Sequence, residues 1–466
     1  MKYEEWVAGK LSTVPPTGYS DINAEWPHLF PFQRDVAAWA LRRGRAAAFL
    51  DTGLGKSRIQ LTWAGEVSRR EFAPVIILAP LAVASQTARE AAAIGMSAKV
   101  CREAGDVTDG VNIVNYDRIH KLDMSQFAGV VLDESSIIKS SGSKTLAELL
   151  EAFAQTPFKL ACTATPSPND YTELGTHAEF LGICTKAEML AEYFCHDGGE
   201  TSTWRLKGHA RTAFWRWVSG WAAMVRMPSD LGYPDDGYRL PPMRIVSHVI
   251  AADHVSVQST GLLFASEART LTERRAAKKG TMGSRVAACA ELVNAEPEEP
   301  WVVWADLNAE GDALEEAIEG AVQVAGADDA DMKEARLDAF ATGGARALVS
   351  KVKICGWGLN WQHCARMAFV GVNDSFEAFY QAVRRCYRFG QTREVVVHVF
   401  SSELEGAVTK NIERKRADAE AMGAELSAYT RDAVRENVTG QARQTNAYGA
   451  EVEMVIPEWI QTEGES

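Results

Sequence analysis

With 466 residues, the chain is about three times as long as a typical domain, so two folded cores are a better expectation than one. Hydrophobic residues make up 46% and charged residues 24%, a globular composition that excludes wholesale disorder and a fibrous structure. The net charge of −13 argues against a protein that coats nucleic acid through bulk electrostatics, so any nucleic-acid track must be a local basic groove.

The N-terminal residues, Met1 to Trp6, lack the basic and then apolar regions of a signal peptide. The most continuous apolar stretch, residues 75–84, is interrupted by Pro80 and is roughly half as long as a bilayer span. It is typical of a buried strand and the turn after it. We therefore expect a cytoplasmic protein with no membrane partner. Its eight cysteines contain no Cys-x-x-Cys pair, which favours reduced, mostly buried thiols.

A glycine-containing loop lies between an apolar run, residues 46–50, and a helical pattern that begins near Ile59. It reads Asp51, Thr52, Gly53, Leu54, Gly55, Lys56 and Ser57. A strand, loop and helix in this order aim backbone N–H groups at a phosphate chain. Lys56 would neutralise the β and γ phosphates of ATP, and the Ser57 hydroxyl would ligate Mg²⁺. The strict pattern requires glycine at position 50, where this chain has leucine, so a strand-to-helix turn without ligand stays an alternative.

A second apolar run, residues 129–132, ends in Asp133 and Glu134. Ligands bind outside the carboxyl ends of strands in open α/β sheets. Asp133 can hold Mg²⁺ through water, and Glu134 can polarise an attacking water. A strand followed by a polar turn is the alternative, and the phosphate loop upstream makes it the weaker one.

Further strand-like runs occur at residues 74–80, 111–116 and 158–162, and they alternate with alanine-rich helical stretches. This alternation predicts an α/β fold with a doubly wound, mostly parallel sheet. The following segment is rich in tryptophan and cations: Trp204, Arg205, Lys207, Arg211, Trp215, Arg216, Trp217 and Trp221. These residues could stack on bases, but we favour a helical protrusion packed by its own tryptophans.

The second half opens with a predicted strand at residues 301–306 and contains the run Gln381 to Gln391. On a helix, Gln381, Arg385 and Arg388 fall on one face. Two guanidiniums on that face could reach a γ-phosphate bound by the other half of the chain, as arginine fingers do. An exposed basic helix is the alternative. His363 and Cys364 have no partner at metal-ligand spacing, so packing at the interlobe seam is the favoured interpretation.

Several of these segments resemble superfamily 2 helicases, most closely the Swi/Snf-type DNA translocases. The loop Asp51 to Ser57 is similar to the family's Asp-Glu-Met-Gly-Leu-Gly-Lys-Thr, and Leu132 to Lys139 is similar to Val-Asp-Glu-Ala-His-Arg-Ile-Lys. Residues 163–166 resemble Thr-Gly-Thr-Pro, residues 356–360 resemble Gly-Leu-Gly-Ile-Asn, and residues 381–391 resemble Gln-Ala-Ile-Asp-Arg-Ala-His-Arg-Ile-Gly-Gln. The match covers roughly residues 29–400.

The resemblance implies roles for further residues. Gln33 lies where the family reads adenine, and Gly358 and Gln381 join the nucleotide site. Residues that couple hydrolysis to nucleic acid would be Thr163, Thr165, Ser350 and Asn360. Ser136 replaces the family's histidine after the acidic pair, which would alter that coupling. The large insertion of eukaryotic remodellers is absent, so the resemblance favours a compact prokaryotic or viral motor.

The expected architecture is two tandem RecA-like P-loop lobes. We place an N-terminal extension at 1–20, the first lobe at 21–240 with a helical protrusion at about 167–240, an interlobe connection at 241–283, the second lobe at 284–400 and a helical tail at 401–466. Candidates for a basic groove are Arg269, Arg274, Arg275, Lys278, Lys279 and Arg285, and a second group is Lys410, Arg414, Lys415 and Arg416. Solvated helix faces are the alternative for both groups.

The predicted function is a nucleic-acid-stimulated ATPase that moves along DNA, with duplex DNA favoured over single-stranded DNA or RNA. Two alternatives stay open: a degenerate motor that serves as a DNA- or partner-binding scaffold, and a strand-separating helicase. No nuclease constellation occurs in the sequence, so any cutting of DNA would need a protein partner. Such a partner could be a nuclease or a replication or recombination factor.

Overall fold

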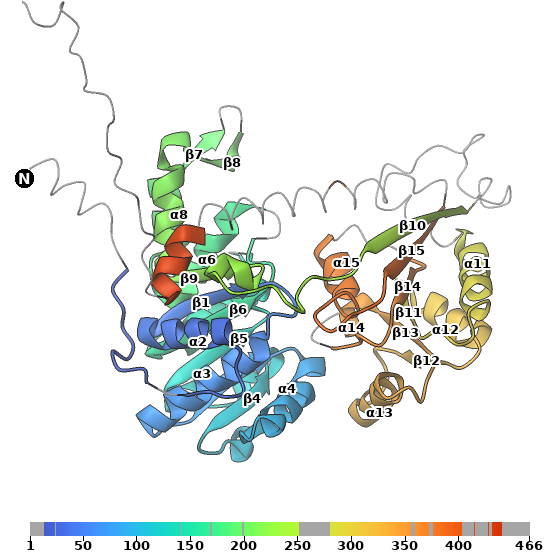
Figure 1. Cartoon of the computed structure of the whole chain (residues 1–466), viewed down its shortest axis with the longest axis horizontal. Coiled ribbons are helices and arrows are strands. Elements are labelled where there is room, and N and C mark those ends of the chain that lie inside the picture. Colours follow the sequence, from blue (N-terminus) through green and yellow to red (C-terminus); the bar gives the residue numbers. More distant parts are fainter. Residues whose placement is uncertain are drawn as a thin grey trace, which may run out of the picture.

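The computed structural model describes residues 14–23, 25–140, 142–167, 170–197, 200–250, 280–355, 359–371, 376–402, 414, 427 and 431–439. These residues form two α/β lobes, each built on a parallel sheet flanked by helices (Figure 1). The predicted fold class is therefore confirmed, and the arrangement is compatible with two RecA-like lobes.

Among the described residues, the sheet of the first lobe has seven strands, each parallel to its neighbours. Their spatial order is β3 (Ala98–Cys101), β4 (Val111–Asn115), β2 (Val75–Ala79), β5 (Gly129–Asp133), β6 (Phe158–Thr163), β1 (Arg45–Leu50) and β9 (Ala222–Val225). The helices of this lobe are α2 (Pro31–Arg43), α3 (Lys56–Glu71), α4 (Leu81–Ala93), α5 (Lys144–Ala152), α6 (Leu174–Leu181), α7 (Lys186–Tyr193) and α8 (Arg211–Ser219).

The strands of this sheet are apolar on both faces because helices cover both. Successive side chains of a strand point to opposite faces. Ala46, Ala48 and Leu50 of β1 accordingly belong to the core shared with α2, α3 and α4. Ala47 and Phe49 belong to the opposite core, which is shared with α5, α6 and α8. Because all these strands are parallel, their carboxyl ends meet at one edge of the sheet.

The sheet of the second lobe has six strands within the described residues. Their order is β10 (Met243–Ile250), β15 (Val395–Ser402), β14 (Arg366–Phe369), β11 (Trp301–Ala305), β13 (Ala347–Lys351) and β12 (Ala321–Val324). Its helices are α11 (Met282–Asn294), α12 (Asn308–Ala317), α13 (Ala330–Ala341), α14 (Val352–Cys355) and α15 (Phe376–Val383). One core joins the sheet to α13, α14 and α15, and the other joins it to α11 and α12.

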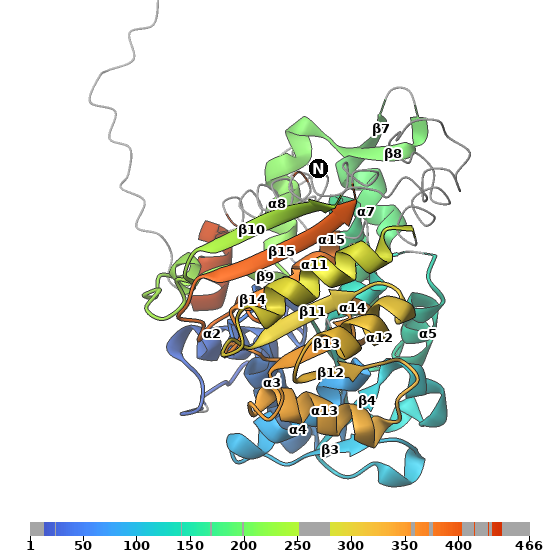
Figure 2. The same cartoon turned by 90° about the vertical axis from the view of Figure 1, so that its right-hand side faces the viewer.

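The second lobe includes a strand, β10, that precedes the predicted start of this lobe at residue 284. This strand was assigned to the interlobe connection, yet it pairs with β15 in parallel over its whole length, from Met243 opposite Val395 to Ile250 opposite Ser402 (Figure 2). As an edge strand it is only half-buried, so it lacks the continuous apolar run that marks the central strands. Its membership of the sheet depends on pairing with a strand about 150 residues away, which no local pattern records.

The segment at residues 167–240 is also less helical than predicted. Strands β7 (Phe194–Asp197) and β8 (Glu200–Leu206) form an antiparallel hairpin, and β9 joins the main sheet beside β1. Trp215, Trp217 and Trp221 are buried in the core that covers Phe49, so they are not available for stacking on bases. The packing interpretation of these three tryptophans is confirmed. Trp204 lies on the hairpin, with its ring 3.9 Å from that of His196.

The described part of the C-terminal tail returns to the first lobe. Residues 431–439 form a helix whose Val434 and Val438 are buried in the core that contains α2 and α3 (Figure 1). Arg431 pairs with Asp230 at 3.2 Å, and the Asn437 side chain donates to the Ser219 carbonyl at 2.9 Å. Among the described helices, none has the length and apolar character needed to cross a bilayer.

One member of the first predicted basic group, Arg285, does not lie on the surface. It is fully buried at the start of α11, where it forms an ion pair with the equally buried Glu310 at 2.8 Å and donates to the Val370 carbonyl. It therefore supports the second lobe from within rather than lining a groove. Of the other candidates, only Arg414 lies within the described residues, and it is exposed.

We expect Glu310→Gln to lower the free energy of unfolding by about 3 kcal/mol, because it removes the negative charge that faces the buried Arg285 guanidinium. The amide oxygen can still accept the N–H groups of Asp306 and Leu307, so the change isolates the charge. Urea denaturation of the full chain measures it. Glu148→Gln, in the exposed pair with Lys144, is the control and should cost about 0.5 kcal/mol or less. Equal costs for the two variants would contradict the buried-pair interpretation.

Candidate active site

A cleft of about 320 Å³ lies between the two lobes, a size suited to a small ligand. Both lobes contribute side chains to it. The residues that line it are Phe30, Gln33, Thr52, Gly53, Gly55, Lys56, Ser57, Arg58, Val83, Glu90, Ala93, Asp133, Glu134, Tyr238, Gln362, Arg385, Arg388 and Phe389. Most of the predicted site residues of the two halves of the chain are thus in one place.

The phosphate-loop candidate has the predicted local structure. Strand β1 ends at Leu50, and α3 begins at Lys56. Gly53 and Gly55 have φ angles of 94° and 81°, a left-handed conformation that side chains disfavour. An added Cβ at Gly55 would also lie 2.2 Å from the Gln33 amide nitrogen. Lys56 Nζ donates to the carbonyls of Leu50 and Asp51 at 2.9 and 3.5 Å, so its ammonium group is held at the mouth of the loop.

Gln33 connects the start of α2 to this loop. Its amide nitrogen donates to the Leu54 carbonyl at 3.0 Å, and its amide oxygen accepts from Phe30 N–H at 2.9 Å. One further N–H and one further lone pair of the amide are available to a ligand in the cleft. Leu54 itself is buried, and its part in the site is this carbonyl.

The acidic pair lies at the carboxyl end of β5, beside the loop. The side chain of Gln60, one turn into α3, donates to Asp133 at 2.8 Å. Glu134 follows in a left-handed conformation with φ of 55°, which is strained for a residue with a side chain. Its carboxylate accepts from the Thr163 hydroxyl at 3.5 Å. The sharp turn directs Glu134 into the cleft, next to Asp133.

Burial and the neighbouring Glu134 raise the pKa of Asp133 to about 6, despite the opposing effects of Gln60 and Lys56. Burial also lowers the pKa of Lys56, against the attraction of the carboxylates around it. Two carboxylates close together in a poorly hydrated site are suited to a divalent cation, whose charge would offset their repulsion. Ser57 and Asp133 both line the cleft, so they fit the predicted Mg²⁺ ligands.

The predicted coupling threonines lie behind the acidic pair. Thr163 ends β6, and its hydroxyl also accepts from Thr165 N–H at 3.1 Å. The Thr165 hydroxyl is buried without a hydrogen-bond partner. Ser136, which stands in place of the family's histidine, is buried. A histidine does contact this segment from another element: His177 of α6 lies 3.1 Å from the Ser135 hydroxyl.

The two arginines reach the cleft, but the helix predicted to carry them is shorter than expected. Helix α15 ends at Val383, and residues 384–388 continue as tight turns, for example from Arg385 N–H to the Ala382 carbonyl. Arg385 and Arg388 each donate to the Leu359 carbonyl at 3.3 Å. Gln381 is fully buried and binds the Arg385 guanidinium at 3.0 Å. It therefore positions Arg385 and does not line the cleft, which corrects its assignment to the nucleotide site.

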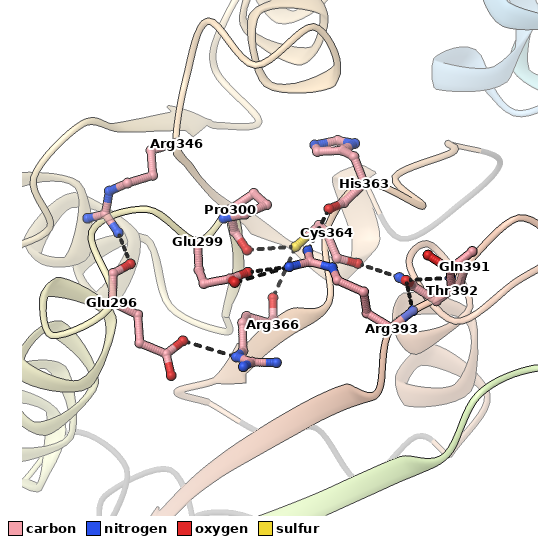
Figure 3. A network of polar contacts seen from close by, with 10 residues as sticks. All are labelled: Glu296, Glu299, Pro300, Arg346, His363, Cys364, Arg366, Gln391, Thr392 and Arg393. Carbon is pink, nitrogen blue, oxygen red and sulfur yellow. Dashed lines mark hydrogen bonds and ion pairs between the residues drawn. The ribbon is translucent and has the colours of Figure 1, made fainter.

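Gln391 and a polar network hold this turn in place (Figure 3). The buried Gln391 amide donates to the carbonyls of Cys364 and Cys386 and accepts the N–H groups of Thr392 and Arg393. Arg393 in turn pairs with Glu299 at 2.8 Å and donates to the His363 carbonyl. The His363 ring packs against Phe340, and the Cys364 thiol donates to the Pro300 carbonyl. Both partners belong to the second lobe, so packing is confirmed but its predicted place at the interlobe seam is corrected.

The arginines make this end of the cleft strongly cationic. Burial and the adjacent Arg385 lower the pKa of Arg388 to about 10, and burial lowers the pKa of Arg385. The Arg388 Nε group is buried without a hydrogen-bond partner. Two neighbouring guanidiniums with an unused N–H donor can bind an anion with several oxygens, such as a phosphate group.

Two other residues that were predicted to couple hydrolysis to nucleic acid have partners within the protein. Ser350 is buried in the second lobe, where its hydroxyl donates to the Val324 carbonyl at 2.7 Å, which corrects its expected contact with nucleic acid. Asn360 crosses between the lobes, and its amide lies 3.5 Å from Glu90 of α4. Gly358 lies outside the described residues.

Several residues of the cleft carried no recognisable signal in the sequence. Glu90 occurs in an alanine-rich helix, and Tyr238 follows a loop near the end of the first lobe. The Tyr238 ring packs against Phe389 of the second lobe at 4.6 Å and against Phe32 at 5.5 Å. These residues approach the loop only through the tertiary fold.

We expect Asp133→Asn to stabilise the free protein at neutral pH but not in acid. A carboxyl whose pKa is about 6 when folded and 3.8 when unfolded contributes stability below pH 4 and loses it as the pH rises through 6. The substitution should therefore add about 2–3 kcal/mol to the free energy of unfolding at pH 8. Denaturation between pH 4 and 8 measures this. A constant difference over that range would contradict it, and Asp236→Asn, at an exposed position, should show no effect.

The comparison with known proteins adds no family. No protein-family model matches this chain, and no curated protein matches its sequence. The geometry of the cleft is therefore the basis on which its function is proposed.

Proposed function

We propose that this protein is an ATP-hydrolysing motor that moves along nucleic acid, with duplex DNA as the favoured track. One observation carries the proposal: Lys56, Asp133 and Glu134 of the first lobe and Arg385 and Arg388 of the second line the same cleft. A nucleotide bound there would contact both lobes. Its hydrolysis would then change the affinity between them, which is the requirement for a two-lobe motor.

The first lobe would bind the phosphates. Thr52, Gly53, Gly55, Lys56 and Ser57 line the cleft at the start of α3, where the helix dipole favours an anion, and Lys56 supplies a positive charge. A Mg²⁺ ion held by Ser57 and Asp133 would neutralise phosphate oxygens. Glu134 would orient a water for attack on the γ-phosphorus, so that the bond to the bridging oxygen breaks and ADP and phosphate form.

The second lobe would stabilise the charge that develops during this transfer. Arg385 and Arg388 are held by the Leu359 carbonyl, by Gln381 and by the turn that Gln391 closes. Because these contacts within the protein fix the two guanidiniums, little reorganisation would be needed in the transition state. Release of phosphate would remove their anionic partner and weaken the closed arrangement.

The choice of track rests on the resemblance of residues 381–391 to DNA translocases. Gln391 itself is buried and serves the turn, so it does not contact nucleic acid. ATPase rates measured with duplex DNA, single-stranded DNA and RNA separate the three possibilities. Stimulation by duplex DNA supports the proposal, and stimulation by single strands alone favours a strand-separating helicase. ATP hydrolysis that no nucleic acid stimulates would contradict the proposed motor and indicate an ATPase that does not act on nucleic acid.

We expect Lys56→Ala to abolish ATP hydrolysis without loss of the fold, because the ammonium group would contact the phosphates. ATPase activity with and without DNA measures the effect, and urea denaturation checks the fold. Lys99→Ala, at an exposed position in β3, is the matched control and should retain full activity. Turnover that survives in Lys56→Ala would contradict the phosphate-loop assignment. Absence of hydrolysis in the unaltered protein would instead favour the scaffold alternative.

We expect Arg388→Ala to bind ATP normally but to hydrolyse it about 10³-fold more slowly, because arginine fingers act on the transition state. Equilibrium binding of a fluorescent ATP analogue and single-turnover hydrolysis separate the two effects. Arg102→Ala, at an exposed position, is the control for loss of a positive charge. Loss of ATP binding together with loss of the fold would mean that Arg388 is structural.

A further inference from the structure

A mostly buried polar contact joins the phosphate loop directly to the second lobe. Asp51, the first residue after β1, accepts a hydrogen bond from the Tyr380 hydroxyl at 3.0 Å and pairs with Arg384 at 3.3 Å. Tyr380 is in α15, and Arg384 is the residue that follows its end. We call these three residues the Asp51 bridge. Asp51 belongs to the predicted phosphate loop and Arg384 to the run Gln381 to Gln391, whereas Tyr380 lies outside both motifs.

The Asp51 bridge differs in kind from a second interlobe ion pair among the described residues. Arg89 and Glu334 also pair across the lobes at 3.5 Å, but their side chains are 63% and 57% exposed. The side chains of Arg384 and Asp51 are only 15% and 19% exposed. A solvated pair contributes little, whereas a shielded pair with several hydrogen bonds is specific to one geometry. Separation of the lobes would break the Asp51 bridge.

The two ionised members of the Asp51 bridge, Asp51 and Arg384, both carry their charges in this structure. Burial acts to raise the pKa of Asp51, but Arg384, the Thr52 N–H group and Lys56 outweigh it and lower the pKa. Burial likewise acts to lower the pKa of Arg384, and Asp51 and Tyr380 outweigh it. The Arg384 guanidinium also lies over the Tyr380 ring at 4.9 Å, which fixes its direction.

The two ends of the Asp51 bridge adjoin the reacting groups of the proposed function. Asp51 accepts from Thr52 N–H at 2.6 Å and shares its backbone with the loop that ends in Lys56. Arg384 is next to Arg385 in the same turn. At the same interface, a Cβ on Gly53 would lie 2.8 Å from the Phe389 nitrogen, so the loop and the turn are already in close contact. A shift of either end would move a charged group of the cleft.

From this geometry we infer that the Asp51 bridge sets the register of the lobes, with Arg384 and Tyr380 as positioning residues that place Arg385 and Arg388 over the phosphate loop. The inference rests on the proposed ATPase function for its catalytic consequence, and on the interlobe contact alone for its structural one.

The test is a double-mutant cycle of Asp51→Asn and Arg384→Gln. Asn at position 51 keeps an oxygen for Thr52 N–H and Tyr380, so only the charge is lost. Each single variant should bind ATP as the unaltered protein does and lower kcat about tenfold or more, since small misplacements of catalytic groups slow the chemical step strongly. The double variant should be no slower than the slower single variant, because both remove one interaction. Arg384→Lys, which keeps the charge, should recover part of the rate.

Glu334→Gln, which breaks the exposed interlobe pair, is the matched control and should keep the full kcat. Additive losses in the double variant, or a normal kcat in Arg384→Gln, would overturn the inference. Small-angle X-ray scattering supplies a readout that is independent of activity: Arg384→Gln should have a larger radius of gyration than the unaltered protein. If the unaltered protein hydrolyses no ATP, the proposed function fails, yet an unchanged radius in Arg384→Gln would still overturn the inference separately.

Discussion

The cleft depends on one constraint of parallel sheets: the carboxyl ends of all their strands meet at the same edge. In the first lobe this constraint places the loop after β1, the acidic pair after β5 and Thr163 at the end of β6 next to one another. The register of β1, β6 and β5 fixes these distances, and two apolar cores hold the register from both faces. The polar groups of the site therefore need no contacts of their own to be brought together.

The second lobe positions its site residues differently, because Arg385 and Arg388 follow the end of a helix instead of the end of a strand. The turn at residues 384–391 is held by the Gln391 amide and by Arg393 with Glu299 (Figure 3). Arg385 and Arg388 share the Leu359 carbonyl, a neutral partner, while the carboxylate of Glu134 attracts both guanidiniums. Arg385 and Arg388 thus line the same cleft as Lys56 and the glycines of the loop, together with the carboxylates of Asp133 and Glu134. Such an arrangement favours a polyanion that carries a divalent cation.

Strain and charge burial are concentrated at this site. Glu134 is one of two described residues with a side chain and a positive φ, and the pKa of the adjacent Asp133 is raised to about 6 by burial and by Glu134. Both features destabilise the free protein locally, and both would be relieved or used when a nucleotide and its cation bind. In contrast, the fully buried pair of Arg285 and Glu310 is a structural contact, although the sequence predicted Arg285 as part of a basic surface.

The sequence by itself determined the alternation of strands and helices and the positions of the loop at residues 51–57 and of the acidic pair at the ends of their strands, because these depend on short apolar runs and on the chemistry of adjacent residues. It also indicated Arg385 and Arg388, although their helix ends earlier than predicted. Only the tertiary structure decided that β10 belongs to the second sheet, that Gln381 and Ser350 are internal supports, and that Asp51 contacts Tyr380 and Arg384. Each of these depends on segments far apart in the chain, and a local pattern contains no information about which distant surface will cover it.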